Sequence, residues 1–284
     1  MELFTRTRLK SRSVRIPNLK IVSRGIWIIT LLLAFPGLAV GQGWDRSRYE
    51  NGDRKSGYLF LGLQTQALQD DDFLNPGMFA VDQGALLWST KDGPEGLSCA
   101  SCHNNTYDNM RGVAARLPRY DTLTKGIINL ELLINRERVN RLGAEPWAYE
   151  SDEMLAMTTF LSYQSRGILR EVIVTGMAEP FFEQGRQHFF TRRGQLDLSC
   201  NQCHDDRDGM MLRGDRMSQG QTTGFPFYRL MWRSMGSTHR MFAWCNEAMR
   251  AEPYEYGSPE YLALELYVAW RGRGLPIETP AVRR

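Results

Sequence analysis

The chain is poor in cysteine, in histidine and in long apolar segments. Its 284 residues include five cysteines and four histidines. Four of the cysteines form two C-x-x-C pairs, and their use in those motifs leaves no pair for a disulfide. Beyond residue 41 no apolar run approaches the roughly 20 residues that a membrane-spanning helix needs. The sequence therefore excludes a disulfide-rich scaffold and predicts a soluble mature chain without a membrane span.

Residues 1–41 have the three parts of a secretory signal peptide. Seven basic residues precede a short apolar core at 26–35, and Leu38-Ala-Val-Gly41 offers a small-residue cleavage site before Gln42. The alternative is an uncleaved anchor, which is less favoured because the apolar core is short. The sequence thus predicts cleavage after residue 41 and a protein of the periplasm.

The basic charge of the chain belongs mainly to this leader. Loss of its seven basic residues and one acidic residue changes the formal net charge from +3 to −3. A slightly acidic mature chain lacks the cationic surface that nucleic-acid binding requires, so no nucleic-acid partner is expected.

The two cysteine pairs share the pattern C-x-x-C-H, which attaches c-type haem. The cysteine sulfurs add to the haem vinyl groups and the adjacent histidine ligates the iron. A zinc half-site or a thioredoxin-type redox pair would not repeat this histidine in both copies. The sequence therefore predicts two covalently bound haem c groups. Their attachment and iron-ligating residues are Cys99, Cys102 and His103 in the first motif, and Cys200, Cys203 and His204 in the second.

The segments around the motifs also repeat, with an offset of about a hundred residues. Gln83-Gly84 and Gln184-Gly185 each begin 16 residues before their motif. Downstream, Ser151 and Ser258 are the expected N-caps of two closing helices. We therefore predict a mostly α-helical fold with two tandem cytochrome c-type domains. The first domain is predicted to cover residues 42–175, including an N-terminal extension. The second is predicted to cover residues 176–284 and to carry the active site.

Those closing helices are expected to end at glycines, Gly167 in the first unit and Gly272 or Gly274 in the second.

The fifth cysteine, Cys245, follows His204 by 41 residues, a normal distance for a distal haem ligand in a small cytochrome domain. A thiolate is one of the groups that can ligate haem iron. Met241 and Met249 are alternative ligands, and an inert buried thiol is the plainest alternative. An idle thiol is a liability in an oxidising compartment, which favours an iron-linked or reactive Cys245.

The first unit has no counterpart of this thiol. The strict repeat offset places Arg138 there, and an offset with one gap places Glu137 there. Three methionines are further candidates for the distal ligand of the first haem: Met110, Met154 and Met157. The sequence leaves this ligand open.

Three arginines lie near Cys245 in the sequence: Arg229, Arg233 and Arg240. Clustered arginines usually form a solvated, ion-paired surface. Beside a thiolate they could also bind an oxyanion through paired donors and lower the thiol pKa.

The second unit resembles the SoxA family of bacterial thiosulfate oxidation. The stretches that carry the resemblance are Leu196–Asp206, Phe225–Trp232, Gly236–Arg240, Cys245-Asn246, Arg250–Pro253, Gly257–Glu260 and Gly274–Pro280. The resemblance covers most of the mature chain.

The resemblance implies an L-cysteine S-thiosulfotransferase, which joins thiosulfate oxidatively to a cysteine of a SoxYZ-type carrier protein while electrons leave through haem. It implies a heterodimer with a small SoxX-type cytochrome. It also implies that Cys245 is the distal ligand of the active haem and carries the sulfur as a persulfide. The alternative is a dihaem electron-transfer cytochrome without substrate chemistry.

The chain departs from the family pattern at two positions. The resemblance implies a substrate-binding arginine four residues before Cys245, where this chain has Met241; Arg240, one residue earlier, is the candidate to replace it. It also implies a second ligating cysteine in the first unit, whose place is taken by Glu137.

Overall fold

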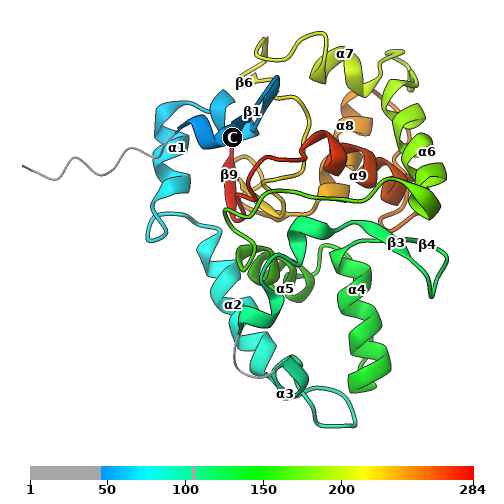
Figure 1. Cartoon of the computed structure of the whole chain (residues 1–284). Helices are drawn as coiled ribbons and strands as arrows, with labels where there is room; N and C mark the ends of the chain where they lie inside the picture. Colours follow the sequence, from blue (N-terminus) through cyan, green and yellow to red (C-terminus); the bar gives the residue numbers. More distant parts are fainter. Residues whose placement is uncertain (1–45, 104–106) are drawn as a thin grey trace, which may run out of the picture. The chain divides into compact units, whose positions relative to one another are not determined.

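The helices follow the same order in the two halves of the chain (Figure 1). The computed structural model describes residues 46–103 and 107–284, so the predicted signal peptide lies outside the described residues. The first half contains α1 (Leu63–Asp70), α2 (Met78–Ser89), α3 (Cys99–His103), α4 (Leu130–Glu137) and α5 (Asp152–Tyr163). The second half contains α6 (Glu179–Phe190), α7 (Cys200–His204), α8 (Thr238–Ala248) and α9 (Pro259–Arg271).

Helices α2 to α5 thus correspond in order to α6 to α9, and both halves also insert a β-hairpin before the third helix of the set. No helix of the described residues is long and apolar enough to cross a membrane.

A close helix crossing organises each half. Helix α2 packs on α5, and α6 packs on α9. At the crossings Gly84 faces the backbone carbonyl of Ala156, and Gly185 faces that of Ala263; a Cβ at either glycine would collide with that carbonyl. The repeated glycine of the sequence is therefore required by backbone-to-backbone approach.

Serine caps begin the two closing helices, as predicted. Ser151 Oγ accepts a hydrogen bond from the Met154 amide at 3.2 Å, and Ser258 Oγ accepts one from the Tyr261 amide at 3.4 Å. The predicted end of α5 at Gly167 is wrong, because the helix ends at Tyr163 and Gly167 lies in the following turn. Gly272 caps α9 as expected.

The sheets are small, in agreement with a mostly helical cytochrome fold. Three are two-stranded hairpins: β1 (Glu50–Asn51) with β2 (Arg54–Lys55), β3 (Arg119–Asp121) with β4 (Gly126–Ile128), and β5 (Met211–Leu212) with β6 (Asp215–Arg216). The fourth has β7 (Phe227–Arg229) between β8 (Ser234–Gly236), which is antiparallel, and β9 (Ala281–Arg283), which is parallel.

Short 3-10 turns connect these elements: Arg46–Tyr49, Gly57–Phe60, Tyr107–Met110, Ala114–Arg116 and Gly176–Ala178.

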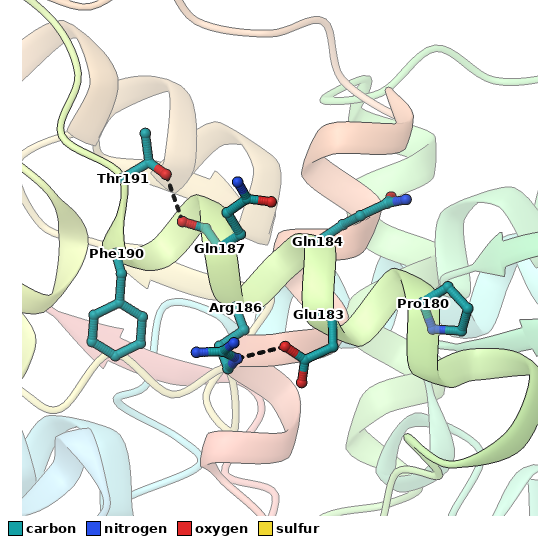
Figure 2. A pocket seen from close by; sticks show the side chains of 7 residues that line it. All are labelled: Pro180, Glu183, Gln184, Arg186, Gln187, Phe190 and Thr191. Atoms are coloured by element: carbon teal, nitrogen blue, oxygen red, sulfur yellow. Dashed lines mark hydrogen bonds and ion pairs between the residues drawn. The ribbon is translucent and has the colours of Figure 1, made fainter.

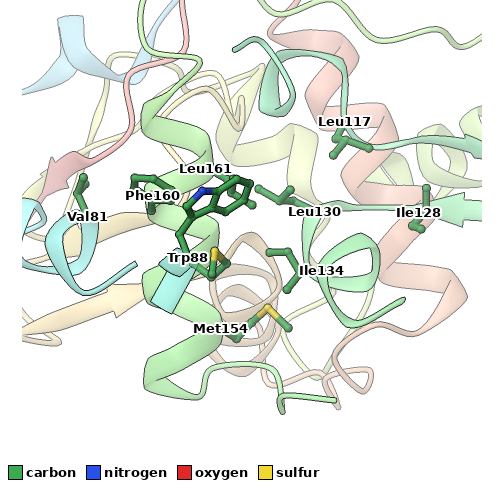
Figure 3. Packing of buried hydrophobic residues seen from close by; sticks show 10 residues of the cluster. Val81, Trp88, Leu117, Ile128, Leu130, Ile134, Met154, Phe160 and Leu161 are labelled. Atoms are coloured by element: carbon green, nitrogen blue, oxygen red, sulfur yellow. The ribbon is translucent and has the colours of Figure 1, made fainter. Parts of the chain in front are cut away.

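Apolar packing fills the first half and also joins the two halves. In the first half, Trp88 of α2 packs with Leu130 and Ile134 of α4 and with Phe160 and Leu161 of α5 (Figure 3). A second cluster combines Ile127 of the first half with Leu262 and Leu266 of the second. The described residues, 46–103 and 107–284, accordingly belong to one compact unit.

Buried acids lie where the halves meet. Asn129 Nδ2 donates to Glu265 Oε2 at 3.0 Å, and His239 Nε2 lies 3.0 Å from the same oxygen. Glu131, in the first turn of α4, is 8% exposed. Burial first, and then the neighbouring Glu265, raises the pKa of Glu131 to about 8.

This acid makes stability depend on pH. The pKa of Glu131 in the folded protein lies above its ordinary value. Its contribution to the free energy of unfolding is therefore fully present below about pH 4.5 and is lost as the pH rises towards 8. Glu131→Gln should therefore raise the free energy of unfolding at pH 8 by about 1–2 kcal/mol, which raises the unfolding temperature by a few degrees. At pH 5 the same substitution should change the unfolding temperature little. Circular dichroism melts of the holoprotein measure this, with the exposed Glu145→Gln as the matched control. Equal shifts at both pH values would contradict it.

Candidate functional site

The two C-x-x-C-H motifs each form a short helix: α3, which follows α2, and α7, which follows α6. Cys102 is exposed and the other four cysteines are half-buried. The cysteines of each motif stand three residues apart, so that both lie on one side of a helical turn.

The surroundings of the second motif fit a haem-ligating histidine. His204 Nδ1 lies 2.7 Å from the backbone carbonyl oxygen of Ser218, which fixes the ring and leaves Nε2 as the metal-ligating nitrogen. Gly220 packs against the face of the same ring, where a Cβ would come within 2.9 Å of it. The backbone thus holds the ring at two places, at its edge through Ser218 and at its face through Gly220.

The first motif has a similar aromatic neighbour. The centroids of the Trp88 and His103 rings are 5.6 Å apart, and those of the matching pair, Phe189 and His204, are 6.5 Å apart. The indole Nε1 of Trp88 is buried without a hydrogen-bond partner in the part of the chain that the structure describes. An unpaired buried donor beside the histidine is consistent with a polar group of a bound cofactor.

Cys245 lies on α8, close to the second motif. It is half-buried, and its charge would interact with those of Cys200 and Cys203. Burial raises the pKa of the Cys245 thiol to about 12, and the charge of Arg229 opposes this rise. This is the effect expected of an arginine beside the thiol.

The guanidinium of Arg240 contacts residues other than Cys245. Its Nη1 donates to Ser234 Oγ and to the Met235 carbonyl, each at 3.1 Å, and lies 3.6 Å from Glu150 Oε2. Five residues separate Arg240 from Cys245 on α8, which places them on different faces of the helix.

Arg229 of β7, in contrast, reaches the face of α8 that carries Cys245. It is 5% exposed, and its Nη1 donates to the Sδ of Met241 at 3.1 Å. Met241 stands one helical turn before Cys245. The sequence included Arg229 in the arginine cluster but gave no reason to prefer it, because its proximity depends on the pairing of β7 in the sheet.

The helix caps identify the counterpart of Cys245 in the first half. Asn129 caps α4 by accepting from the Leu132 amide, and Ser237 caps α8 by accepting from the Arg240 amide. Counted from these caps, Glu137 corresponds to Cys245 and Arg138 to Asn246.

A matched polar contact supports this register. Arg138 Nη2 bonds to Asp92 Oδ2 at 2.8 Å, and Asn246 Oδ1 accepts from Arg193 Nη1 at 2.8 Å. Asp92 and Arg193 lie the same distance before their respective motifs. In the first half the arginine of this contact follows α4 and its partner precedes the motif. In the second half the arginine precedes the motif and its partner lies on α8, so the contact is kept with the two positions exchanged.

An extra residue follows Glu137. The path from Asn129 to Ala144 is one residue longer than that from Ser237 to Ala251, and a π-helix at Arg138–Leu142 accommodates the insertion. Glu137 itself is 47% exposed and forms ion pairs with Arg136 and Arg141.

The methionine candidates occupy different environments. Met154 and Met157 are each 1% exposed within the apolar core of the first half, and Met110 packs at the edge of that core.

A surface pocket on α6 lies apart from these groups. Figure 2 shows its lining, which is Pro180, Glu183, Gln184, Arg186, Gln187, Phe190 and Thr191. None of these residues is a cysteine or a predicted metal ligand, and the pocket is not the candidate site.

Comparison with known proteins places the chain among the c-type cytochromes. The model of the SoxA/TsdA cytochrome c domain matches residues 83–169. The chain therefore belongs to a class of proteins with covalently bound haem c.

Curated relatives define the family. L-cysteine S-thiosulfotransferase subunit SoxA of Pseudaminobacter salicylatoxidans is 42% identical over 81% of this chain and 80% of its own. The protein of that name from Rhodovulum sulfidophilum is 40% identical over 88% of this chain and 94% of its own. The crystal structure of SoxXA from P. pantotrophus matches with a TM-score of 0.79 and 42% identity, over 81% of this chain and 87% of that one. The chain belongs to the SoxA family.

The register of α4 and α8 predicts that a thiolate can be introduced into the first half. In the holoprotein, Glu137→Cys should add a low-spin thiolate-ligated haem signal to the electron paramagnetic resonance spectrum, because residue 137 occupies the position of Cys245. Arg141→Cys, one turn farther and 73% exposed, is the control and should leave the spectrum unchanged. An unchanged spectrum for Glu137→Cys would show that the register does not carry over to the iron.

Proposed function

We propose that this protein joins thiosulfate oxidatively to a cysteine of a SoxYZ-type carrier protein. The balanced reaction is R–SH + S2O3²⁻ → R–S–S–SO3⁻ + H⁺ + 2e⁻, where R is the carrier. The observation that carries the proposal is a thiol, Cys245, within electrostatic reach of the second C-x-x-C-H motif in a chain of the SoxA family.

The residues of both motifs fit covalently bound haem. We infer two haem c groups, attached through Cys99 and Cys102 and through Cys200 and Cys203. His103 and His204 would be their iron-ligating histidines, and Cys245 the second protein ligand of the second haem. Bound haem supplies a centre that accepts electrons one at a time.

Cys245 is proposed as the residue that handles sulfur. A thiolate or persulfide sulfur is a soft nucleophile that exchanges with sulfur-bonded partners. It is half-buried and so partly accessible, whereas Ala243 and Asn246 beside it on α8 are buried.

Arg240 was the sequence candidate for the substrate cation. Its bonds to Ser234, Met235 and the first-half Glu150 favour a different role, in which it fixes the start of α8 against its surroundings.

The proposed setting follows from the family and the leader. A small SoxX-type cytochrome would be the partner, in line with the SoxXA assembly of the structural relative. We propose residues 1–41 as a cleaved signal peptide, 42–175 and 176–284 as the two cytochrome c-like domains, and the periplasm as the location. Membership of the SoxA family fits an extracytoplasmic cytochrome.

Removal of the thiol tests the reaction. Cys245→Ala in the holoprotein should lower thiosulfate-dependent modification of the carrier cysteine by at least about a thousandfold, because the nucleophile is lost. Both haems should remain, since neither attachment cysteine is changed. Carrier modification is measured by mass spectrometry and haem content by the pyridine haemochrome. Undiminished modification would rule out the role assigned to Cys245, whereas absence of carrier modification by the wild-type complex would favour the alternative, an electron-transfer cytochrome without substrate chemistry.

Intact-mass analysis of the exported protein tests the cofactor count and the leader. The expected species begins at Gln42 and carries two haem masses. One haem mass, or a retained leader, would refute the corresponding part of the proposal independently of the catalytic assay.

A further inference from the structure

The guanidinium of Arg229 is buried, but its hydrogen bonds and its ion pair to the surrounding residues are weak. Arginine has five N–H donors and no acceptor. Nη1 contacts the thioether of Met241, which is a weak acceptor, and Nη2 lies 3.6 Å from Asp215 Oδ2. The buried Nε has no hydrogen-bond partner among the described residues.

Two indole rings and a β-sheet hold this group in place. The Cζ of Arg229 lies 4.3 Å from the ring centroid of Trp244 and 5.1 Å from that of Trp232. Its backbone lies in β7, the central strand, paired with Ser234 and Arg283. The cation is therefore fixed before any ligand arrives, so little side-chain entropy remains to be lost on binding.

The positive charge is incompletely balanced. Asp215 is the only carboxylate paired with Arg229 among the described residues, and its side chain is 36% exposed. A buried charge with one distant counter-ion and weak hydrogen bonds attracts an anion.

The thioether of Met241, on α8, occupies Nη1 of Arg229. Met241, Trp244 and Cys245 are all half-buried. A thioether side chain is flexible, so an anion with better acceptors can displace it from Nη1. Thiosulfate has three sulfonate oxygens at one end and a soft sulfur at the other. This suits a guanidinium at Met241 and a cysteine sulfur one helical turn beyond Met241 on α8.

We propose that Arg229 binds the sulfonate group of thiosulfate, that Met241 is its movable cover, and that the terminal sulfur of thiosulfate is thereby directed to Cys245. This inference rests on the proposed function and adds the substrate-binding residue of that site. It adds no covalent step: Arg229 holds the end of thiosulfate that does not react.

Steady-state kinetics of the holoprotein complex test this role. Arg229→Met keeps the bulk between the two indoles and removes the charge. It should raise KM for thiosulfate about 10- to 100-fold, the effect of losing a charge-assisted hydrogen bond, with a much smaller change in kcat. Arg229→Lys should give an intermediate KM, because charge without the planar fork is retained.

Three further variants sharpen the test. Met241→Arg in the Arg229→Met background should recover at least tenfold of the lost affinity, since residue 241 lies at the tip of the missing guanidinium. Arg216→Gln, an exposed arginine next to Asp215, is the matched control and should leave KM unchanged. Arg240→Gln decides between the two arginines of the region.

The outcomes separate this inference from the proposed reaction. An unchanged KM in a folded, haem-loaded Arg229→Met protein overturns it, as does a larger rise in KM for Arg240→Gln than for Arg229→Met. If Arg229→Met does not fold, Arg229→Lys and thiosulfate titration of the wild-type and Arg229→Lys haem spectra decide the matter. If the wild type binds thiosulfate in an Arg229-dependent way without modifying the carrier, the site stands and the proposed reaction falls.

Discussion

The close crossing of two helices in each half is the constraint on which the structure depends. Gly84 lets α2 approach the backbone of α5, and Gly185 lets α6 approach that of α9. Side chains of ordinary size would separate these helices, and the motif helix that follows α2 or α6 would move with them. The crossings therefore fix where the C-x-x-C-H turns lie relative to α4 and α8, which carry Glu137 and Cys245.

The two halves share this helix arrangement but differ in the residue at one matched position of α4 and α8. The same eighth position after the helix cap is a cysteine in the second half and an ion-paired glutamate in the first. The insertion after Glu137 is absorbed by a π-helix rather than by a loop, which keeps Arg138 in contact with Asp92. The duplicated fold thus places a thiol at this position in one half and a carboxylate in the other, and the proposed substrate chemistry is assigned to the half that has the thiol.

Electrostatics around Cys245 follow from the arrangement of elements more than from the number of charges nearby. Arg240 is adjacent in sequence but bonds to β8 and to the first half. Arg229 is sixteen residues away in the chain, yet its charge opposes the rise in the pKa of Cys245. Placing a cation on a strand beneath α8 allows it to be rigid and buried, which a side chain on the exposed surface of the helix could not be.

The sequence by itself determined the helical class, the repeat, the serine caps and the family, because these depend on local motifs and on spacing. Ser151 and Ser258 cap their helices through contacts three residues away, which any reader of the chain can anticipate. The end of α5 was misplaced because a glycine in a following turn resembles a terminating glycine. The choice between Glu137 and Arg138 needed the structure, since a single insertion shifts the alignment and only paired caps and contacts locate it. Arg229 also needed the structure, because sheet pairing and helix packing bring together residues whose separation along the chain carries no signal.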